Sequence, residues 1–225
     1  MSIIHGLLAQ LQHYLGRYEC HITVDLTCDS QFADFQKKCN ELGAKALIIQ
    51  LPTGNMQTQP MLSQYYQGDA QLVYQKIDQL YQSIAQDFTV VRLKVEADVD
   101  NQNIPQTDQA AQALPKACYF EHHVKMQLPK TLALQPLAEK LSQYSGYLSR
   151  SALSSDIEGG LFELRFVTQR FRLGDKAAYQ HLKALLNFLQ TEKITVIKTI
   201  REFTIFDSNL SVDSGWTNDI YDKHE

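Results

Sequence analysis

The sequence has few of the residues that mark secreted, membrane-spanning or cysteine-ligated metal proteins. Its 225 residues include four cysteines, six prolines, ten glycines and one tryptophan, and no apolar run is long enough to span a bilayer. The cysteines have no metal-ligand spacing, and three of them fall on apolar strand or helix faces; they are Cys20, Cys28, Cys39 and Cys118. We therefore expect reduced thiols and a cytoplasmic protein with no membrane partner.

Other absences exclude further classes. The first 17 residues lack a basic front and a small-residue cleavage site, so their helical apolar spacing predicts a packed helix instead of a signal peptide. A formal net charge of −4 argues against broad nucleic-acid binding. The loop 52–60 is too poor in glycine to cradle phosphate, and the serine-rich stretch 149–160 lacks the nucleophile signature Gly-x-Ser-x-Gly.

What is present is one pattern of elements that occurs twice. Strand-like alternation and helical periodicity follow the order β-α-β-β-α-β over residues 18–97 and again over 118–207. This is the order of the ferredoxin-like unit, an antiparallel sheet with both helices on one face. We predict an α+β tandem duplication of that unit, with an N-terminal helix at 1–17, a linker at 98–117 and a surface tail at 208–225 anchored by Trp216.

The first strands of the two units echo each other. "YECHITVDL" (18–26) and "YFEHHVKMQL" (119–128) place Glu19 and His21 in the same frame as Glu121 and His123. Because strand side chains alternate, the apolar positions must meet the helices. His21 and His123 then lie on the open, polar face of each sheet, whereas His122 points into the core.

The last strand of each unit brings charge to the same open face. Arg92 and Glu96 belong to the first unit, and Lys198 and Glu202 stand at the corresponding positions of the second. We expect the two open faces to line one polar cleft, in which these four residues bind a ligand. The plainer interpretation is that they form ordinary ion pairs along exposed strands. In the same way we interpret Arg165, Arg170 and Arg172 as a solvated strand edge.

Two resemblances follow from these residues. "YFEHHVKMQL", together with "VVRLKVEA", "RFVTQRF" and "DSNLSVDSGW", resembles a family of uncharacterised bacterial proteins, and this resemblance implies no activity. The strand "CHITVDL" is similar to the motif of the two-histidine phosphoesterases, which are bilobal proteins with one His-x-Thr or His-x-Ser in each lobe.

The second resemblance implies a metal-independent phosphodiesterase that acts on a small, cyclic or 2',3'-linked nucleotide and needs no cofactor. Its two histidines would be His21 and His123, serving as general base and acid. Thr23 matches the hydroxyl that holds a phosphate oxygen, but Lys125 stands where the second hydroxyl belongs. At Lys125 the sequence therefore departs from the motif of that family.

Two alternatives stay open. His21, Glu96, His123 and Glu202 are ligand types that suit zinc, manganese or iron, which predicts a metal-dependent enzyme with ligands from both repeats. Otherwise the cleft belongs to a non-catalytic sensor of a small anionic molecule or to a protein-interaction module. In the first and third interpretations the partner is a small anion, and a nucleotide is the leading example.

Overall fold

The helices and strands follow the predicted α+β order. The computed structural model describes residues 4–28, 31–153 and 160–217. In chain order the elements are α1 (Leu7–His13), β1 (Arg17–Asp25), α2 (Gln31–Glu41), β2 (Lys45–Gln50), β3 (Thr58–Gln67), α3 (Ala70–Ala85), β4 (Thr89–Asp98), α4 (Asp108–Gln112), β5 (Tyr119–Pro129), α5 (Leu134–Ser142), β6 (Tyr147–Ser151), β7 (Phe162–Phe171), α6 (Asp175–Thr191), β8 (Thr195–Asp207) and the 3-10 helix η2 (Leu210–Asp213). The short helix α4 lies in the stretch predicted as a linker.

The strands form a closed barrel in the order β1-β3-β2-β6-β7-β5-β8-β4, and neighbouring strands are antiparallel. β4 pairs with β8 over Lys94–Asp98, whereas β2 meets β6 only at Ile49 and Gln50. Sheet edges carry unpaired backbone N–H and C=O groups, and here the edge strands of the two halves form hydrogen bonds with each other. The expected cleft between two open sheets is therefore the interior of one barrel.

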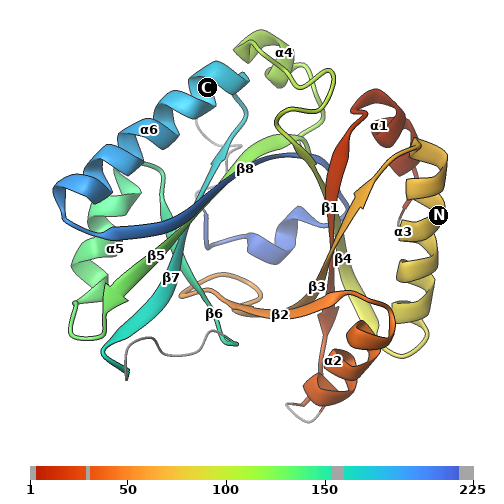
Figure 1. Ribbon diagram of the computed structural model, residues 1–225, viewed down its shortest axis with the longest axis horizontal. Helices are drawn as coiled ribbons and strands as arrows, with labels where there is room; N and C mark the ends of the chain where they lie inside the picture. Colours follow the sequence, from red (N-terminus) through yellow and green to blue (C-terminus); the bar gives the residue numbers. More distant parts are fainter. Residues whose placement is uncertain (1–3, 29–30, 154–159, 218–225) are drawn as a thin grey trace.

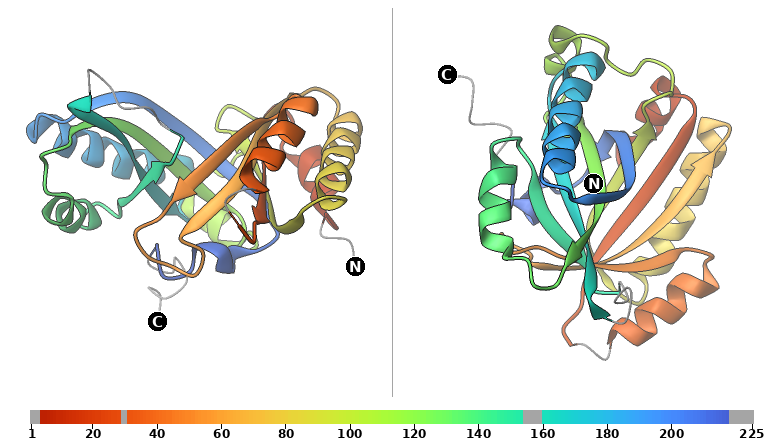
Figure 2. Two further views of the ribbon diagram at one scale, coloured as in Figure 1. Left: turned by 90° about the horizontal axis from the view of Figure 1, so that it is seen from below. Right: turned by 60° about the vertical axis from the view of Figure 1, so that its left-hand side comes forward.

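The helices cover the outside of the barrel, with α1, α2 and α3 over one half and α5 and α6 over the other (Figures 1 and 2). In α6 the buried side chains recur at helical spacing, so one face of the helix packs on the barrel; they are Ala178, Leu182, Leu185 and Leu189. The side chain of Asp69 caps α3 by accepting hydrogen bonds from the backbone N–H groups of Gln71 and Leu72. No helix in the described ranges has both the length and the apolar character needed to cross a bilayer.

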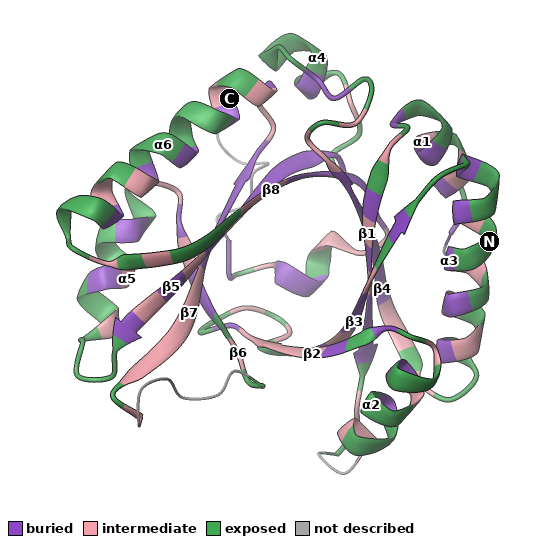
Figure 3. Cartoon of the chain, in the orientation of Figure 1, coloured by how far each residue is buried: buried purple, intermediate pink, exposed green. Residues whose placement is uncertain are grey.

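Side chains alternate along the strands, as the sequence predicts. The apolar ones pack under the helices, and the polar ones point into the barrel. Cys20, Ile22 and Val24 of β1 are fully buried in the cluster under α1, α2 and α3. Val124 and Met126 of β5 are buried in the smaller cluster under α5 and α6. The residues between them point the other way, and burial continues along the strands that enclose the interior (Figure 3).

The C-terminal segment corrects one sequence-based prediction. Residues 208–217, which we call the C-terminal plug, were expected on the surface, but the chain turns back after β8 and η2 lies across one end of the barrel (Figures 1 and 2). Val212, Asp213 and Trp216 are buried, so Trp216 does anchor the segment. The polar composition of this segment predicted a solvent-exposed position. It is buried because ion pairs with buried arginines compensate the charge of Asp213. The rest of the predicted tail, 218–225, lies outside the described residues.

Candidate functional site

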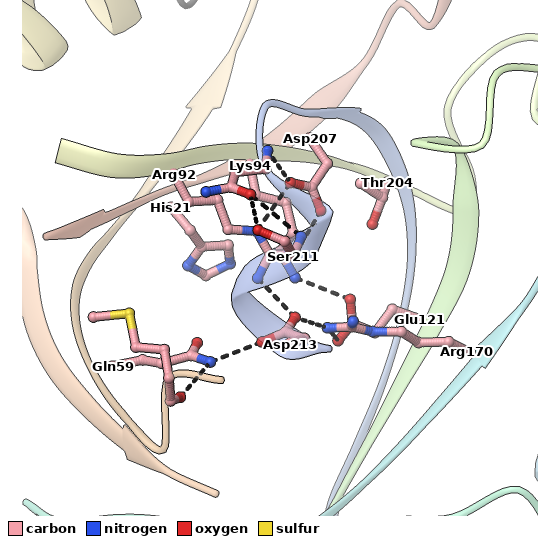
Figure 4. Close-up of polar contacts among 12 residues, drawn as sticks. His21, Gln59, Arg92, Lys94, Glu121, Arg170, Thr204, Asp207, Ser211 and Asp213 are labelled. Carbon is pink, nitrogen blue, oxygen red and sulfur yellow. Dashed lines mark hydrogen bonds and ion pairs between the residues drawn. The ribbon is translucent and has the colours of Figure 1, made fainter. Parts of the chain in front are cut away.

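A continuous polar network runs through the barrel interior, and carboxylates and cations alternate along most of it (Figure 4). Lys94 Nζ lies 2.9 Å from both Glu96 Oε1 and Glu121 Oε2. Arg170 Nη2 lies 3.1 Å from Glu121 Oε1 and 2.7 Å from Asp213 Oδ2. Each of these cations therefore bridges two carboxylates, and the network joins strands β4, β5 and β7 to the plug.

One part of the network, the histidine cluster, consists of Glu19, His21, Glu96, His123 and Glu202. His21 Nε2 lies 2.9 Å from Glu96 Oε2 and 3.7 Å from Glu19 Oε1. His21 Nδ1 is buried and has no hydrogen-bond partner among the described residues. His21 thus joins two carboxylates, as the cations elsewhere in the network do.

The second histidine reaches Glu96 from the other half of the barrel. Glu96, His123 and Glu202 each offer one ligand atom, and these three atoms all lie within 4.8 Å of one another. His123 Nδ1 lies 3.1 Å from Thr168 Oγ1, and His123 Nε2 lies 3.7 Å from Glu121 Oε1. Glu96 is fully buried and Glu202 is 8% exposed, so water screens this triad poorly.

The pKa values of Glu96 and Glu202 in the histidine cluster are shifted in opposite directions. Burial raises the pKa of Glu202 well above its usual range, and the nearby charges of Glu96 and Glu19 raise it further. Burial acts in the same direction on Glu96, but Lys94 and His21 outweigh it and hold that pKa well below its usual range. Burial also lowers the pKa of His123, against the opposing effect of Glu121, and so favours a neutral imidazole.

The other part of the network, the arginine cluster, consists of Gln59, Arg92, Arg170, Asp207 and Asp213. Arg92 Nη1 donates to Asp213 Oδ2 at 2.7 Å, and Arg92 Nε donates to Asp207 Oδ1 at 2.9 Å. Both arginines have pKa values well above their usual range, because the surrounding carboxylates outweigh the effect of burial. In this cluster two guanidinium groups face two carboxylates, and the charges balance.

The structure places the predicted site residues unequally. It brings His21, Glu96, His123 and Glu202 together, as described above. Thr23 is 1% exposed and pairs in register with Arg92. Lys198 is exposed, and Lys125 lies over the ring of Phe166. Among the described residues, no hydrogen bond or ion pair connects Lys125 or Lys198 to either histidine.

The plainer interpretation, an ion pair between Arg92 and Glu96, is not among the described contacts, because Arg92 binds Asp207 and Asp213. The interpretation of the β7 arginines as a solvated edge is wrong for Arg170, which is 8% exposed. β7 lies between β5 and β6 and is not an edge. Arg165 pairs with Glu163, and Arg172 donates to backbone carbonyl groups.

The sequence reasoning left several network residues out of the site. They are Glu19, Lys94, Glu121, Arg170, Asp207 and Asp213. The repeated frame already contained Glu19 and Glu121, and strand alternation placed Lys94 on the same face. No periodicity or repeat in the sequence indicated Asp213, because it reaches the network only after the chain reverses direction beyond β8.

A pocket of about 240 Å³ opens beside the histidine cluster. Glu19, Tyr65 and Glu202 line it, so the same two carboxylates belong to the pocket wall and to the cluster. Its rim also carries the cationic side chains Arg17 and Lys198. A small molecule in this pocket would meet Glu202 before the rest of the triad.

Neither a protein-family model nor a curated protein matches the sequence. Among solved structures, the acetolactate synthase small subunit from Thermotoga maritima is 12% identical, with 82% of this chain and 92% of that chain covered and a TM-score of 0.29. The encapsulated DyP-type peroxidase from Mycobacterium smegmatis is 9% identical, with 89% and 96% covered and a TM-score of 0.28. A dye-decolorizing protein from V. cholerae is 9% identical, with 88% and 96% covered and a TM-score of 0.26. At these TM-scores the likenesses carry no argument about fold or function.

Proposed function

We propose that the barrel interior binds one divalent metal ion through Glu96, His123 and Glu202, and that the protein is a metal-dependent enzyme. The observation that carries this proposal is the mutual distance of the three ligand atoms, all within 4.8 Å. Two carboxylates and one imidazole suit zinc, manganese or iron. Three protein ligands also leave coordination positions for water or a substrate.

The charge of the histidine cluster supports the proposal. It gathers Glu19, Glu96 and Glu202, whereas Lys94, the cation that pairs with Glu96, is shared with Glu121. Buried carboxylates in excess of cations must bind protons or a metal. A divalent ion between Glu96 and Glu202 would supply the missing positive charge.

The residues around the triad would orient its ligands. The hydroxyl group of Thr168 fixes the ring of His123 through Nδ1, which is how outer residues commonly hold a metal-binding histidine. His21 contacts the Oε2 atom of Glu96, and we assign it the role of positioning that carboxylate. The fourth residue of the predicted ligand set thus supports the other three.

The adjoining pocket supports a small anionic substrate. Arg17 and Lys198, which line the pocket, would attract it, and the positive charge of the metal would offset the repulsion of Glu202. The metal would act as a Lewis acid that polarises a substrate oxygen. This chain's own residues would orient the substrate and exclude bulk water.

We also infer that the two halves are copies of one ferredoxin-like unit. Each half has the strand order last-first-third-second, β4-β1-β3-β2 in one and β8-β5-β7-β6 in the other. A Gly-Asp pair precedes or opens the second long helix in both, at Gly68-Asp69 and Gly174-Asp175. Duplication would explain why both halves supply residues to the metal site.

The metal-independent phosphodiesterase is the second candidate, and one observation favours it. His21 and His123 come from different halves and both lie near Glu96, so one interior holds both imidazoles. A bound phosphate would, however, lie beside Glu96 and Glu202, and like charges repel strongly where water is scarce. Lys125 is not placed to offset them, and we therefore rank the metal site first.

Calorimetric titration of protein dialysed against EDTA tests the proposal with Zn²⁺ and Mn²⁺ as probes. We expect one site per chain in the wild type and an affinity lower by roughly 10–100-fold or more in Glu202→Gln. Glu192→Gln, which changes an exposed carboxylate paired with Lys140, is the matched control and should bind normally. Wild-type binding no tighter than that of Glu202→Gln would contradict the metal site.

A turnover assay separates the two candidates. In EDTA, hydrolysis of a 2',3'-cyclic nucleotide that disappears in both His21→Ala and His123→Ala would establish the phosphodiesterase instead. Hydrolysis that requires added metal and is lost in Glu202→Gln would support the first proposal.

A further inference from the structure

The arginine cluster holds the carboxylate of Asp213 in the way proteins hold an anionic ligand. Arg92 Nη1 and Arg170 Nη2 each donate to Asp213 Oδ2 at 2.7 Å, and Gln59 Nε2 donates to Oδ1 at 2.7 Å (Figure 4). The three donors come from β4, β7 and β3, whereas Asp213 comes from the plug. Two guanidinium groups and an amide around one carboxylate form a typical oxyanion-binding arrangement.

Residues of the barrel strands also hold the two guanidinium groups. Arg92 is fixed by Asp207, and its Nη2 donates to the hydroxyl group of Tyr119 at 3.3 Å. Arg170 is fixed by Glu121 and lies over the ring of Tyr119, 5.2 Å from its centroid. Each guanidinium group therefore has partners on the barrel strands besides Asp213.

Asn209 N–H of the plug donates to the Asp207 carboxylate, but most other polar contacts of the plug are neutral hydrogen bonds, and several go to the loop between β2 and β3. Asn55 Nδ2 donates to the carbonyl of Ser211, and Thr53 Oγ1 donates to the carbonyl of Gly215. Trp216 Nε1 donates to the carbonyl of Leu148 on β6. Neutral hydrogen bonds are individually worth little, so Asp213 provides the strongest attachment of the plug.

We propose that Arg92, Arg170 and Gln59 form a binding site for the carboxylate or phosphate group of a small molecule, which Asp213 occupies in cis. An anionic ligand and the plug then compete for the same donors, and ligand binding displaces the plug. This site is distinct from the metal triad, because Lys94 and Glu121 lie between them in the network.

Removal of the competitor tests the proposal. Asp213→Ala leaves a space of carboxylate size beside the three donors, so formate and inorganic phosphate should bind it at least about tenfold more tightly than the wild type. Titrations with each anion are made at constant ionic strength with sodium chloride. Formate represents carboxylate ligands and phosphate represents phosphoryl ligands, so preference between them identifies the ligand class.

Trp216 reports on the plug, because it is the one tryptophan of the chain and lies 5.6 Å from the guanidinium group of Arg170. Anion binding should produce a saturable fluorescence change and a rise in melting temperature in Asp213→Ala. Exposed Asp100 provides the control, and Asp100→Ala should respond as the wild type does. Adding Gln59→Leu to Asp213→Ala should weaken the response, because it removes one donor.

Equal responses of Asp213→Ala, Asp100→Ala and the wild type to both anions would overturn the proposal. If Asp213→Ala does not fold, Asp213→Asn keeps the volume of the side chain and removes its charge. The proposal then requires that phosphate perturb Trp216 fluorescence at a lower concentration in Asp213→Asn than in the wild type, and the opposite order would overturn it.

Discussion

The histidine cluster and the arginine cluster are parts of one buried network, but they differ in charge balance. In the arginine cluster, two guanidinium groups face Asp207 and Asp213, and each cation contacts two carboxylates. In the histidine cluster, Glu96 shares Lys94 with Glu121, and neither Glu19 nor Glu202 pairs with a lysine or arginine among the described residues. The same barrel therefore contains one region that is electrostatically complete and one that requires a further cation or proton.

This difference assigns different roles to the two regions. A balanced, buried ion-pair network is costly to break, and here it fixes the plug to the barrel. A buried carboxylate with a raised pKa next to a pocket is typical of a functional site. Removal of a cation from the arginine cluster should therefore reduce stability, whereas mutations in the histidine cluster should mainly alter metal binding.

The largest effect is expected from Arg170→Met. The change leaves Glu121 and Asp213 buried without one of their cations, and loss of one partner of a buried pair costs about 3–5 kcal/mol. For a chain of this size, each kcal/mol lowers the melting temperature by roughly 2–4 °C. Urea unfolding monitored by circular dichroism measures the loss.

Arg165→Met provides the comparison on the same strand. Arg165 pairs with Glu163 where both side chains are partly exposed, and such pairs contribute about 1 kcal/mol or less. Equal losses in the two variants would show that the arginine cluster is not the stabilising region.

Much of the fold was predictable from the sequence because it depends on local periodicity. Alternation in β1 separated Cys20 and Ile22 from His21, and helical spacing located the second long helix of each half. The closure of the barrel was not predictable, since the pairs β4–β8 and β2–β6 join residues far apart in the sequence. Alternation determines which face a residue occupies but not which sheet edges meet.

The candidate site shows the same limit. The repeated frame of the two strands identified His21 and His123, and the last strands identified Glu96 and Glu202. The position of the plug could not be read in the same way, because "DSNLSVDSGW" has the polar composition of a surface segment. Asp213 is buried because Arg92 and Arg170, on two distant strands, both point toward it.

The second prediction concerns acid unfolding and separates the clusters by pH. Arg170 and Arg92 outweigh the effect of burial and hold the pKa of Asp213 below its ordinary value of 3.8. Its contribution is therefore complete above pH 3.8 and is lost as the pH falls toward the folded-state pKa. The stability of Asp213→Asn should fall less steeply below that pH, by up to about 1.4 kcal/mol per pH unit.

Urea unfolding between pH 5 and pH 3 measures both slopes. Asp100→Asn, which changes an exposed carboxylate, should keep the wild-type slope. Identical acid slopes in the wild type and in Asp213→Asn would mean that Asp213 gains nothing from the two arginines.

The smallest effect is expected in the histidine cluster, and it has the opposite sign. In metal-free protein at pH 7, Glu202→Gln removes one of three neighbouring carboxylates and keeps the shape of the side chain, so stability should rise by about 1 kcal/mol. The raised pKa of Glu202 means that the folded state favours its protonated form, so the wild type loses stability as the pH rises above 4.5 and the glutamine variant does not. Glu192→Gln should show no such gain.

With saturating Zn²⁺ or Mn²⁺ the order of stabilities should reverse, because the metal stabilises only the wild type. Destabilisation of metal-free Glu202→Gln would instead make Glu202 a structural member of a balanced network, and the contrast between the two clusters would then be lost.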